Sequence, residues 1–520
     1  MDHVFDLAII GGGINGCGCA ADAALRGLSV FLCEKNDLAS QTSSNSSKLI
    51  HGGLRYLEYH DFSMVKKALD EQQALLQLTP HLVHPIRFVL PYNKKGRPIW
   101  LLRIGLFLYD HLSRVNQLPN SKFIRRNPSS PYFTPLVDDL NKGFYFYDCT
   151  TDDARLTIAN ALQASLHGAT ITTQTALVQA EVIDHQWKLT LQPESASPYQ
   201  IRAKTIINAT GPWVSSVSQL LNTPIQHTMS LVKGSHLVVD KLYEGDHAYM
   251  LQHDDKRIIF VIPYHGYSMV GTTDIDYHGT LDNISIDSNE VDYLCSLINQ
   301  YFIKQTQQSN IITTWSGIRP LISENGKDPA ALSRDYAYHF TNQPAPAVTL
   351  YGGKITTYRQ LSQRAIDQLR PIFPDLAPSC TNITPLPGAA LDTMNLTDYF
   401  SYAREKYHWV DQSLLDHYLY TYGTRTELIL LACKKMTDLG IRFAPTLYQR
   451  EVDYLVHEEW ATSSADILCR RTKLGLSMDK ASQLALTDYL ILYSSKICNK
   501  PSKAANTAAS RIDDRSPEKW

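Results

Sequence analysis

The stretch DLAIIGGGINGCGCA, residues 6–20, decides the fold of this chain of 520 residues. Its apolar run, Asp6–Ile10, is typical of a buried strand and leads directly into a glycine-rich turn. The small, alanine-rich segment Cys19–Gly27 predicts a helix that packs closely on a sheet, and Leu28–Cys33 predicts a second strand. Strand, turn, helix and strand in this order indicate a βαβ unit.

The turn carries the pattern G-x-G-x-x-G at Gly11, Gly13 and Gly16. The first glycine permits a tight turn, the second lets a pyrophosphate approach the backbone, and the third lets the helix press on the sheet. Glu34 ends the second strand, where its carboxylate can accept hydrogen bonds from ribose hydroxyls. These features together favour a dinucleotide site over the alternative, a glycine-rich turn without a ligand.

Two later segments favour FAD over NAD. Both NATGPW (Asn208–Trp213) and YGGKITTY (Tyr351–Tyr358) combine a strand end with glycine, so that backbone can approach a ligand again. An isoalloxazine ring needs such additional walls, and a helix N-terminus after Gly353 would favour the negative charge of the reduced ring. Taken alone, YGGKITTY is equally consistent with a strand–turn–helix corner.

Bulk composition excludes several classes. A net charge of -2 gives no basic field for nucleic acid, and nine cysteines without a CxxC pair favour a reduced protein. We expect no secretory signal and no transmembrane span, since the longest apolar run, Ile99–Tyr109, is interrupted by Arg103. Helices are predicted over Asp61–Leu78, Asp152–His167 and much of 395–495, and strands over Ala169–Val178 and Thr205–Thr210.

The motifs GGGINGCG, SSKLIHGGLRYLE, NATGPW, KGSH, GTTD, SGIRPL, SRDY and GGKITTYR occur in this order. Together they resemble the FAD-dependent, quinone-linked sn-glycerol-3-phosphate dehydrogenases. The resemblance implies an α/β fold (α+β overall) in three parts. These are a discontinuous, glutathione-reductase-type FAD domain (1–80, 148–215 and 340–375), an interleaved substrate domain with an antiparallel sheet (81–147 and 216–339), and a C-terminal all-α cap (385–500). The polar tail, 501–520, is expected to be disordered.

The resemblance also implies which residues contact FAD. They are Gly11, Gly13, Asn15, Gly16, Glu34, Lys35, Thr42, Ser46, Ser47, Lys48, Leu49, Gly52, Ala176, Leu177, Ala209, Thr210, Gly211, Trp213, Gly353, Lys354 and Thr356. In SSKLIHGGLRY, residues 46–56, the adjacent glycines would let the flavin ring lie close to the main chain. Without the other motifs, these glycines are consistent with an ordinary turn.

Glycerol 3-phosphate has a dianionic end and a secondary alcohol at C2. The resemblance assigns its binding to Arg55, Tyr56, Thr273, Arg319, Arg334 and Lys354. An arginine suits phosphate because its planar fork donates two parallel hydrogen bonds, although a single arginine is more often part of a structural ion pair. His236 is our first candidate for the base that accepts the hydroxyl proton, and His51 is the second; Arg319 could instead stabilise a developing alkoxide. No metal is expected.

The resemblance implies that electrons pass to ubiquinone or menaquinone. It also implies a homodimer that lies peripherally on the cytoplasmic face of the inner membrane, with part of the protein in the cytoplasm. Residues Lys94–Leu112 mix basic and apolar side chains, as an interfacial helix does. A buried amphipathic helix is the alternative. Three other functions stay open: a glycerol-phosphate oxidase that uses oxygen, a flavin oxidase of amino or hydroxy acids, and a flavin-binding protein without turnover.

Overall fold

The structure, a computed structural model, describes residues 3–94, 96–127, 130–253, 257–323, 335–391 and 393–498. Arg334 and the tail 501–520 lie outside these residues, as does the side chain of Arg55, so the statements about them stay predictions. The helices are α1 (Ile14–Leu25), α2 (Phe62–Leu78), α3 (Ile99–Leu112), α4 (Asp153–Leu166), α5 (Val214–Leu220), α6 (Ser288–Tyr301), α7 (Tyr358–Asp367), α8 (Leu396–Lys406), α9 (Gln412–Tyr422), α10 (Thr426–Ile429), α11 (Gln449–Glu458) and α12 (Lys480–Cys498).

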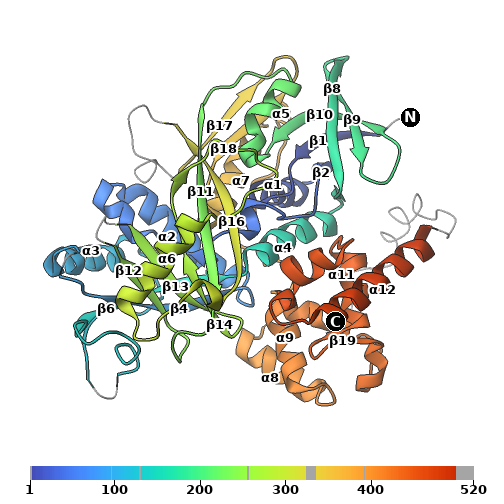
Figure 1. Cartoon of the computed structure of the whole chain (residues 1–520). Helices are drawn as coiled ribbons and strands as arrows, with labels where there is room; N and C mark the ends of the chain where they lie inside the picture. The colour runs from blue at the N-terminus through green and yellow to red at the C-terminus, as the bar shows by residue number, and fades with distance from the viewer. Residues whose placement is uncertain are drawn as a thin grey trace.

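The first sheet is built around the predicted βαβ unit. Its strands lie in the order β17 (Tyr336–Thr341), β18 (Ala347–Gly352), β10 (Tyr199–Asn208), β1 (Val4–Ile10), β2 (Val30–Cys33) and β7 (Thr170–Thr172), with the hairpin β8 (Thr175–Ile183) and β9 (Gln186–Pro193) joined to β10. The strands from β18 to β7 are parallel. Helices α1, α4 and α7 share one core with this sheet, and the hairpin and α5 pack on its other side (Figure 1).

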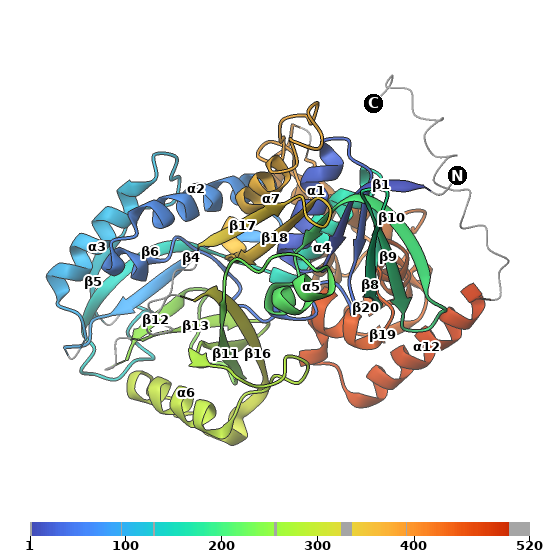
Figure 2. The same ribbon diagram turned by 90° about the horizontal axis from the view of Figure 1, so that it is seen from above.

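The second sheet is largely antiparallel. Its order is β15 (Ile275–Asp276), β11 (Met229–Val239), β14 (Tyr267–Gly271), β13 (Ile258–Tyr264), β12 (Ala248–Gln252), β4 (Val83–Pro91), β6 (Lys142–Thr151) and β3 (Leu49–Ile50), with β16 (Ile311–Ile322) on β11 and β5 (Lys122–Arg125) on β6. One face packs against α2 and α3, and the other packs against α6 (Figure 2).

Several predicted elements are confirmed. Helices α2 and α4 begin at the predicted places, because Asp61 and Asp152 accept hydrogen bonds from the backbone of their first turns. Helix α1 begins at Ile14, five residues before the expected Cys19. The predicted strand Ala169–Val178 is wrong as one element, since a turn that includes Gln174 at φ 51 divides it into β7 and β8.

The C-terminal region forms a separate helical unit beside α4 (Figure 1). Its core is made mainly of Leu and Tyr side chains from α8, α9, α11 and α12. It is not purely helical, because β19 (Arg442–Ala444) and β20 (Leu447–Tyr448) form a two-stranded sheet within it. No helix in the described parts of the chain has the length and apolar content needed to cross a bilayer.

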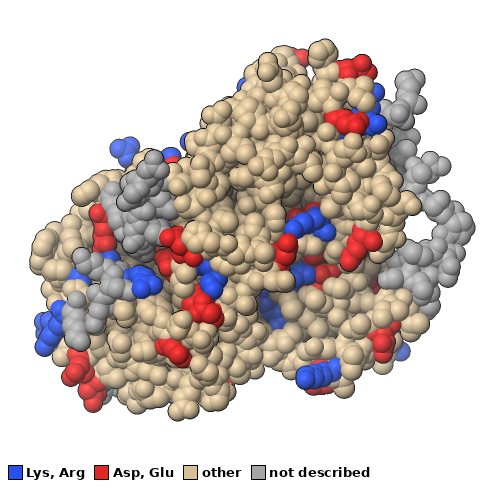
Figure 3. Space-filling model, turned by 45° about the horizontal axis from the view of Figure 1, so that its top comes forward, with Lys and Arg blue, Asp and Glu red and all other residues tan. Residues whose placement is uncertain are grey.

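Charged side chains are scattered over the face shown in Figure 3, where Lys and Arg lie among Asp and Glu. Among the described residues, this face carries no broad basic area of the kind that follows a nucleic-acid backbone. It is hollowed near its centre, where basic and acidic side chains meet.

Candidate active site

A cavity of about 420 Å³ lies where the two sheets meet. Its lining comes from segments far apart in the sequence: the turn after β1, residues 39–47, residues 209–213 after β10, β16, and residues 352–355 after β18. Parallel strands of the first sheet therefore bring three predicted cofactor motifs to one edge, as expected for a ligand site at the carboxyl ends of strands.

The glycine turn has the geometry that the motif predicts. Gly11 has φ +110, and a Cβ there would lie 2.8 Å from the carbonyl oxygen of Ala209. A Cβ at Gly16 would lie 1.9 Å from the carbonyl oxygen of Gly11, so only glycine allows α1 to begin so close to β1. The N-terminus of α1 thus faces the cavity and favours an anionic group there.

Glu34 lines the cavity as predicted, but its carboxylate also shapes the turn. Oε2 accepts a hydrogen bond from the backbone nitrogen of Gly12 at 2.6 Å, and Oε1 accepts one from Asn36 at 2.9 Å. Burial raises the pKa of this carboxyl group. Each oxygen retains a further acceptor position, so both roles are compatible.

Most of the predicted cofactor residues line the cavity together. They are Gly11, Gly13, Asn15, Glu34, Lys35, Thr42, Ser46, Ser47, Leu49, Ala176, Leu177, Ala209, Thr210, Gly211, Trp213, Gly353 and Lys354. Gly16, Lys48, Gly52 and Thr356 are not among the lining residues.

Lys48 shows why a motif residue can lie outside the lining. Its Nζ donates to Asp153 Oδ1 at 2.9 Å and to the carbonyl oxygen of Ser44 at 2.8 Å, and its side chain is buried. Lys48 therefore fixes the loop that contains Ser46 and Ser47 to the start of α4. Gly52 has a similar supporting place, because its backbone nitrogen donates to the Tyr109 hydroxyl at 2.8 Å.

The cavity contains residues that the motifs did not indicate. Ser43 lines it and accepts a hydrogen bond from the backbone nitrogen of Ile14 at 2.9 Å, at the first turn of α1. Ser40, Gln41, Pro212 and Gly317 also line it. Pro212 and Gly317 belong to quoted motifs and could have been included, whereas nothing in the polar loop 36–48 distinguished Ser43 from its neighbours.

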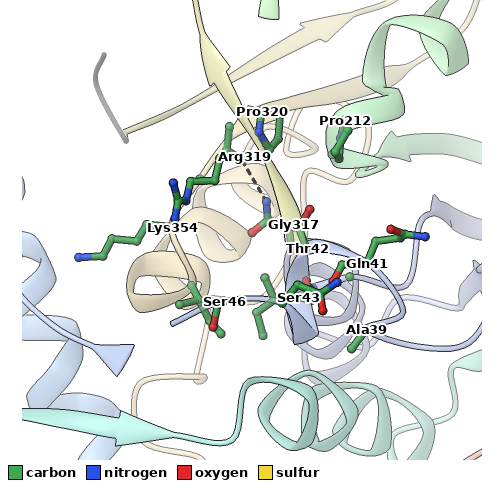
Figure 4. A pocket seen from close by; sticks show the side chains of 18 of the residues that line it. Ala39, Gln41, Thr42, Ser43, Ser46, Pro212, Gly317, Arg319, Pro320 and Lys354 are labelled. Atoms are coloured by element: carbon green, nitrogen blue, oxygen red, sulfur yellow. Dashed lines mark hydrogen bonds between the residues drawn. The ribbon is translucent and has the colours of Figure 1, made fainter. Parts of the chain in front are cut away.

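Two cations line the side of the cavity next to the second sheet. Arg319 pairs with Asp274, and its second guanidinium nitrogen donates to Thr272 Oγ1 at 2.9 Å. Lys354 Nζ donates to the carbonyl oxygen of His51 at 2.5 Å and lies 5.6 Å from the ring centre of Tyr56. Their side chains extend toward the same side of the pocket in Figure 4, away from Ala39 and Gln41.

Thr272 and Thr273 face different surroundings. Thr272 lines the cavity, whereas Thr273 is buried and donates to Glu290 Oε1 at 2.7 Å. Arg319 contacts both residues, since Nη2 donates to Thr272 Oγ1 at 2.9 Å and Nη1 donates to the carbonyl oxygen of Thr273 at 3.4 Å. Of the two side chains, that of Thr272 is on the cavity side and that of Thr273 faces Glu290.

The two candidate histidines also differ in position. His51 lines the cavity, with its ring centre 6.1 Å from that of Phe260. His236 is buried and absent from the lining; its Nε2 lies 2.9 Å from Ser47 Oγ and its ring stacks on Trp315. Burial, followed by the charges of Arg319 and Lys48, holds the pKa of His236 well below 6.5, so its ring is neutral at physiological pH.

Asp148 is a further titratable group in the lining. Its Oδ1 accepts hydrogen bonds from the Tyr109 hydroxyl at 2.7 Å and from Gln72 Nε2 at 2.8 Å. Burial raises the pKa of its carboxyl group from 3.8 to about 6, although these bonds oppose the shift. Asp148 can therefore hold a proton near neutral pH, a property that the sequence did not indicate.

The lining fits FAD on structural grounds. Gly11 and Gly353 both have φ +110 and allow backbone to approach a ligand closely. The buried Oδ1 of Asn15, which lines the cavity, has no hydrogen-bond partner among the residues that the structure describes. The N-terminus of α1 supplies the favourable potential for a pyrophosphate.

Comparison with known proteins agrees with this geometry. Residues 6–359 match the family model "FAD dependent oxidoreductase", and residues 379–492 match "C-terminal domain of alpha-glycerophosphate oxidase". Glycerol-3-phosphate dehydrogenase of Pseudomonas aeruginosa is 44% identical over 94% of this chain and 96% of that protein. D-erythritol 1-phosphate dehydrogenase of Brucella abortus is 41% identical over 93% and 97%, and aerobic glycerol-3-phosphate dehydrogenase of Escherichia coli is 41% identical over 94% and 97%.

Among solved structures, glycerol-3-phosphate dehydrogenase from Bacillus halodurans, complexed with FAD, has the same fold. It is 23% identical, covers 94% of both chains and has a TM-score of 0.72. The predicted fold class and the predicted cofactor, FAD, are confirmed by these findings and by the family match. The chain belongs to the FAD-dependent oxidoreductases, in the family that includes the bacterial glycerol-3-phosphate dehydrogenases.

Proposed function

We propose that this chain oxidises sn-glycerol 3-phosphate to dihydroxyacetone phosphate and passes the electrons to a membrane quinone. The observation that carries the substrate assignment is the presence of Arg319 and Lys354 in one cavity with the FAD motifs. Two cations suit a phosphate dianion better than a single carboxylate. Bound FAD would supply the acceptor for the hydride from C2.

Arg319 would bind and orient the substrate phosphate. Its contacts with Asp274 and Thr272 restrict the guanidinium before substrate arrives, so less side-chain freedom is lost on binding. Lys354 is fixed in a similar way by the carbonyl oxygen of His51. A phosphate held at this end places C2 at a defined distance from the rest of the cavity, which lowers the barrier by positioning.

His51 would accept the hydroxyl proton, because of the two predicted histidines it is the one that lines the cavity. His236 would act indirectly, through its contact with Ser47 Oγ at 2.9 Å. The predicted substrate contacts of Tyr56 remain part of this proposal, since Tyr56 lines the cavity beside Lys354.

Anaerobic mixing tests the substrate. Glycerol 3-phosphate should bleach the flavin absorbance of the FAD-loaded protein, whereas glycerol, which lacks the charged group, should leave it nearly unchanged. Absence of bleaching with folded, FAD-loaded protein would contradict the proposal. D-erythritol 1-phosphate should be tested in the same assay, because the Brucella relative with 41% identity is named for it. Faster bleaching by D-erythritol 1-phosphate than by glycerol 3-phosphate would make the four-carbon phosphate the preferred substrate.

The electron acceptor is tested separately. Reduced protein mixed with a soluble quinone analogue should be reoxidised faster than by oxygen, with little hydrogen peroxide formed. Stoichiometric peroxide and no reaction with the quinone would instead identify an oxidase.

Helix α3 supports the membrane part of the proposal. Leu102, Leu106 and Tyr109 are buried against the second sheet, yet the opposite side exposes Trp100 by 63%, Ile104 by 50% and Phe107 by 60%. The helix is therefore apolar on both sides. Of the two predicted alternatives, a buried helix accounts for one side and an interfacial helix accounts for the other. An exposed aromatic and aliphatic surface on a helix is typical of a segment that inserts into a lipid interface. Lys94 and Arg97 precede this helix in the sequence, and Arg97 pairs with Glu58.

The double variant Trp100→Glu/Phe107→Glu should bind vesicles of anionic lipid much more weakly than the unmodified protein in a pelleting assay. Each change replaces an apolar ring, which would move from water into the lipid interface, with a carboxylate that is stable only in water. The variant Ile383→Glu/Leu431→Glu is the control, since these side chains are exposed by 73% and 64% in the C-terminal region. Equal partition of all three proteins would exclude α3 as the anchor.

A further inference from the structure

Asp37 lies within the chain segment that forms one wall of the cavity, but it does not line the cavity. Glu34 and Lys35 line it just before Asp37, and residues 39–43 line it just after. We call residues 34–43 the cofactor segment. The Asp37 side chain is only 2% exposed, and its carboxylate meets the C-terminal region instead.

Two consecutive arginines of the C-terminal region hold this carboxylate. Arg471 donates to both oxygens, with Nη2 to Oδ1 at 2.8 Å, and Arg470 Nε donates to Oδ2. Both arginines lie in a π-helix, Asp466–Arg471, a conformation that is rare and often found at functional sites. The Arg471 side chain is fully buried, so its charge is compensated by Asp37 rather than by water.

Further contacts fix these arginines to the rest of the molecule. Arg471 Nη2 also donates to the carbonyl oxygen of Glu459 at 2.6 Å, and the carboxylate of Glu459 pairs with Arg155 of α4. Lys473 Nζ donates to Asp152 at the start of α4 at 2.6 Å. The C-terminal region is thereby attached to α4 on one side and to the cofactor segment on the other.

The cofactor segment is tied just as closely to the glycine turn. The backbone nitrogen of Ala39 donates to the carbonyl oxygen of Gly12 at 3.0 Å, and Glu34 accepts from Gly12 at 2.6 Å. Ser43 accepts from Ile14 at 2.9 Å. A shift of Asp37 would therefore move the segment's side chains relative to the N-terminus of α1.

We infer that Arg471, assisted by Arg470, is a positioning residue for FAD, through which the C-terminal region determines how tightly the cofactor is held. The inference rests on the proposed assignment of the cavity to FAD. Arg471 itself does not line the cavity; it acts by restricting the cofactor segment through Asp37. The part of the molecule distant from the chemistry thus contributes to cofactor affinity.

The variant Arg471→Met tests this inference. Protein stripped of flavin is titrated with FAD, and binding is followed by quenching of flavin fluorescence. We expect the dissociation constant of FAD to rise about tenfold or more, because residues in one ion-pair network have interaction energies that correspond to a change of this size. At saturating FAD, the KM for substrate should be unchanged, because the substrate cations are not involved.

Arg425→Met is the matched control, since Arg425 is also a mostly buried arginine but pairs with Glu458 and Tyr454 inside the C-terminal region. Normal FAD affinity in a folded Arg471→Met protein, or an equal loss in Arg425→Met, overturns the positioning role. If the unmodified protein itself takes up no FAD, the assignment of the cavity fails instead. Arg470→Gln, a milder change at a partly exposed side chain, serves if Arg471→Met does not fold.

The variant Asp37→Asn tests the same contact from its other partner. It should weaken FAD binding on its own, and the double variant Asp37→Asn/Arg471→Met should lose little more than either single variant, because both changes break the same contact. Fully additive losses would show that the two residues act separately and would overturn the inference.

Discussion

Replacing Arg319 by alanine is expected to lower kcat/KM for glycerol 3-phosphate by about 100-fold or more. Arg319 lines the cavity and is already restricted by Asp274 and Thr272, so it can offer a planar pair of donors to a phosphate. Loss of this anchor weakens binding and also misplaces C2, so both KM and kcat should change. Steady-state kinetics with glycerol 3-phosphate measures the effect directly.

Arg319→Lys separates charge from geometry. Lysine retains the positive charge but not the fork, and it should recover only part of the activity. Arg87→Ala is the control, because Arg87 lies in β4 of the same sheet, packs among tyrosines and is outside the cavity lining. FAD content must be equal in all variants. Near-normal kinetics of Arg319→Ala would remove Arg319 from the substrate site.

Replacing Gly16 by valine should yield a protein without bound FAD. The first added carbon would lie 1.9 Å from the carbonyl oxygen of Gly11, and real Cβ atoms do not approach within 3.0 Å. Helix α1 must then move away from β1, which displaces the N-terminus that faces the cavity. The absorbance of the purified protein, and its uptake of added FAD, report this loss.

Gly105→Ala is the matched control for this substitution. Gly105 is also inside a helix, but a Cβ there meets nothing within 4 Å. The change should leave FAD content unaltered and stabilise the helix by roughly 0.5–1 kcal/mol. Full FAD content in a folded Gly16→Val protein would contradict the assignment of the glycine turn to the cofactor.

The cofactor side of the site was largely predictable, because each glycine motif is local and the strand order of a parallel sheet brings the motifs together. The side of the cavity proposed to bind substrate was less predictable. Thr272 and Thr273 are adjacent, and only the path of the chain after β14 decides which of the two lines the cavity. The position of His236 behind Ser47 depends on contacts between residues 189 positions apart.

Long-range ion pairs could not be predicted either, because they join residues that are far apart in the sequence. Arg471 and Asp37 are 434 positions apart, and nothing in either local pattern indicates the other. The pairing of Lys48 with Asp153, 105 positions away, was equally unpredictable, and Lys48 is not among the lining residues. The homodimer and the domain boundaries implied by the resemblance stay predictions.

The order of strands in the first sheet has a consequence for biosynthesis. Strand β1 is translated before its partner β10, which begins at Tyr199, and before β18, the next strand of the sheet, which begins at Ala347. A nascent chain therefore cannot close the nucleotide-binding edge until β18 has been translated. Uptake of the flavin must come late, and truncated translation products should accumulate as colourless species that chaperones and proteases can recognise.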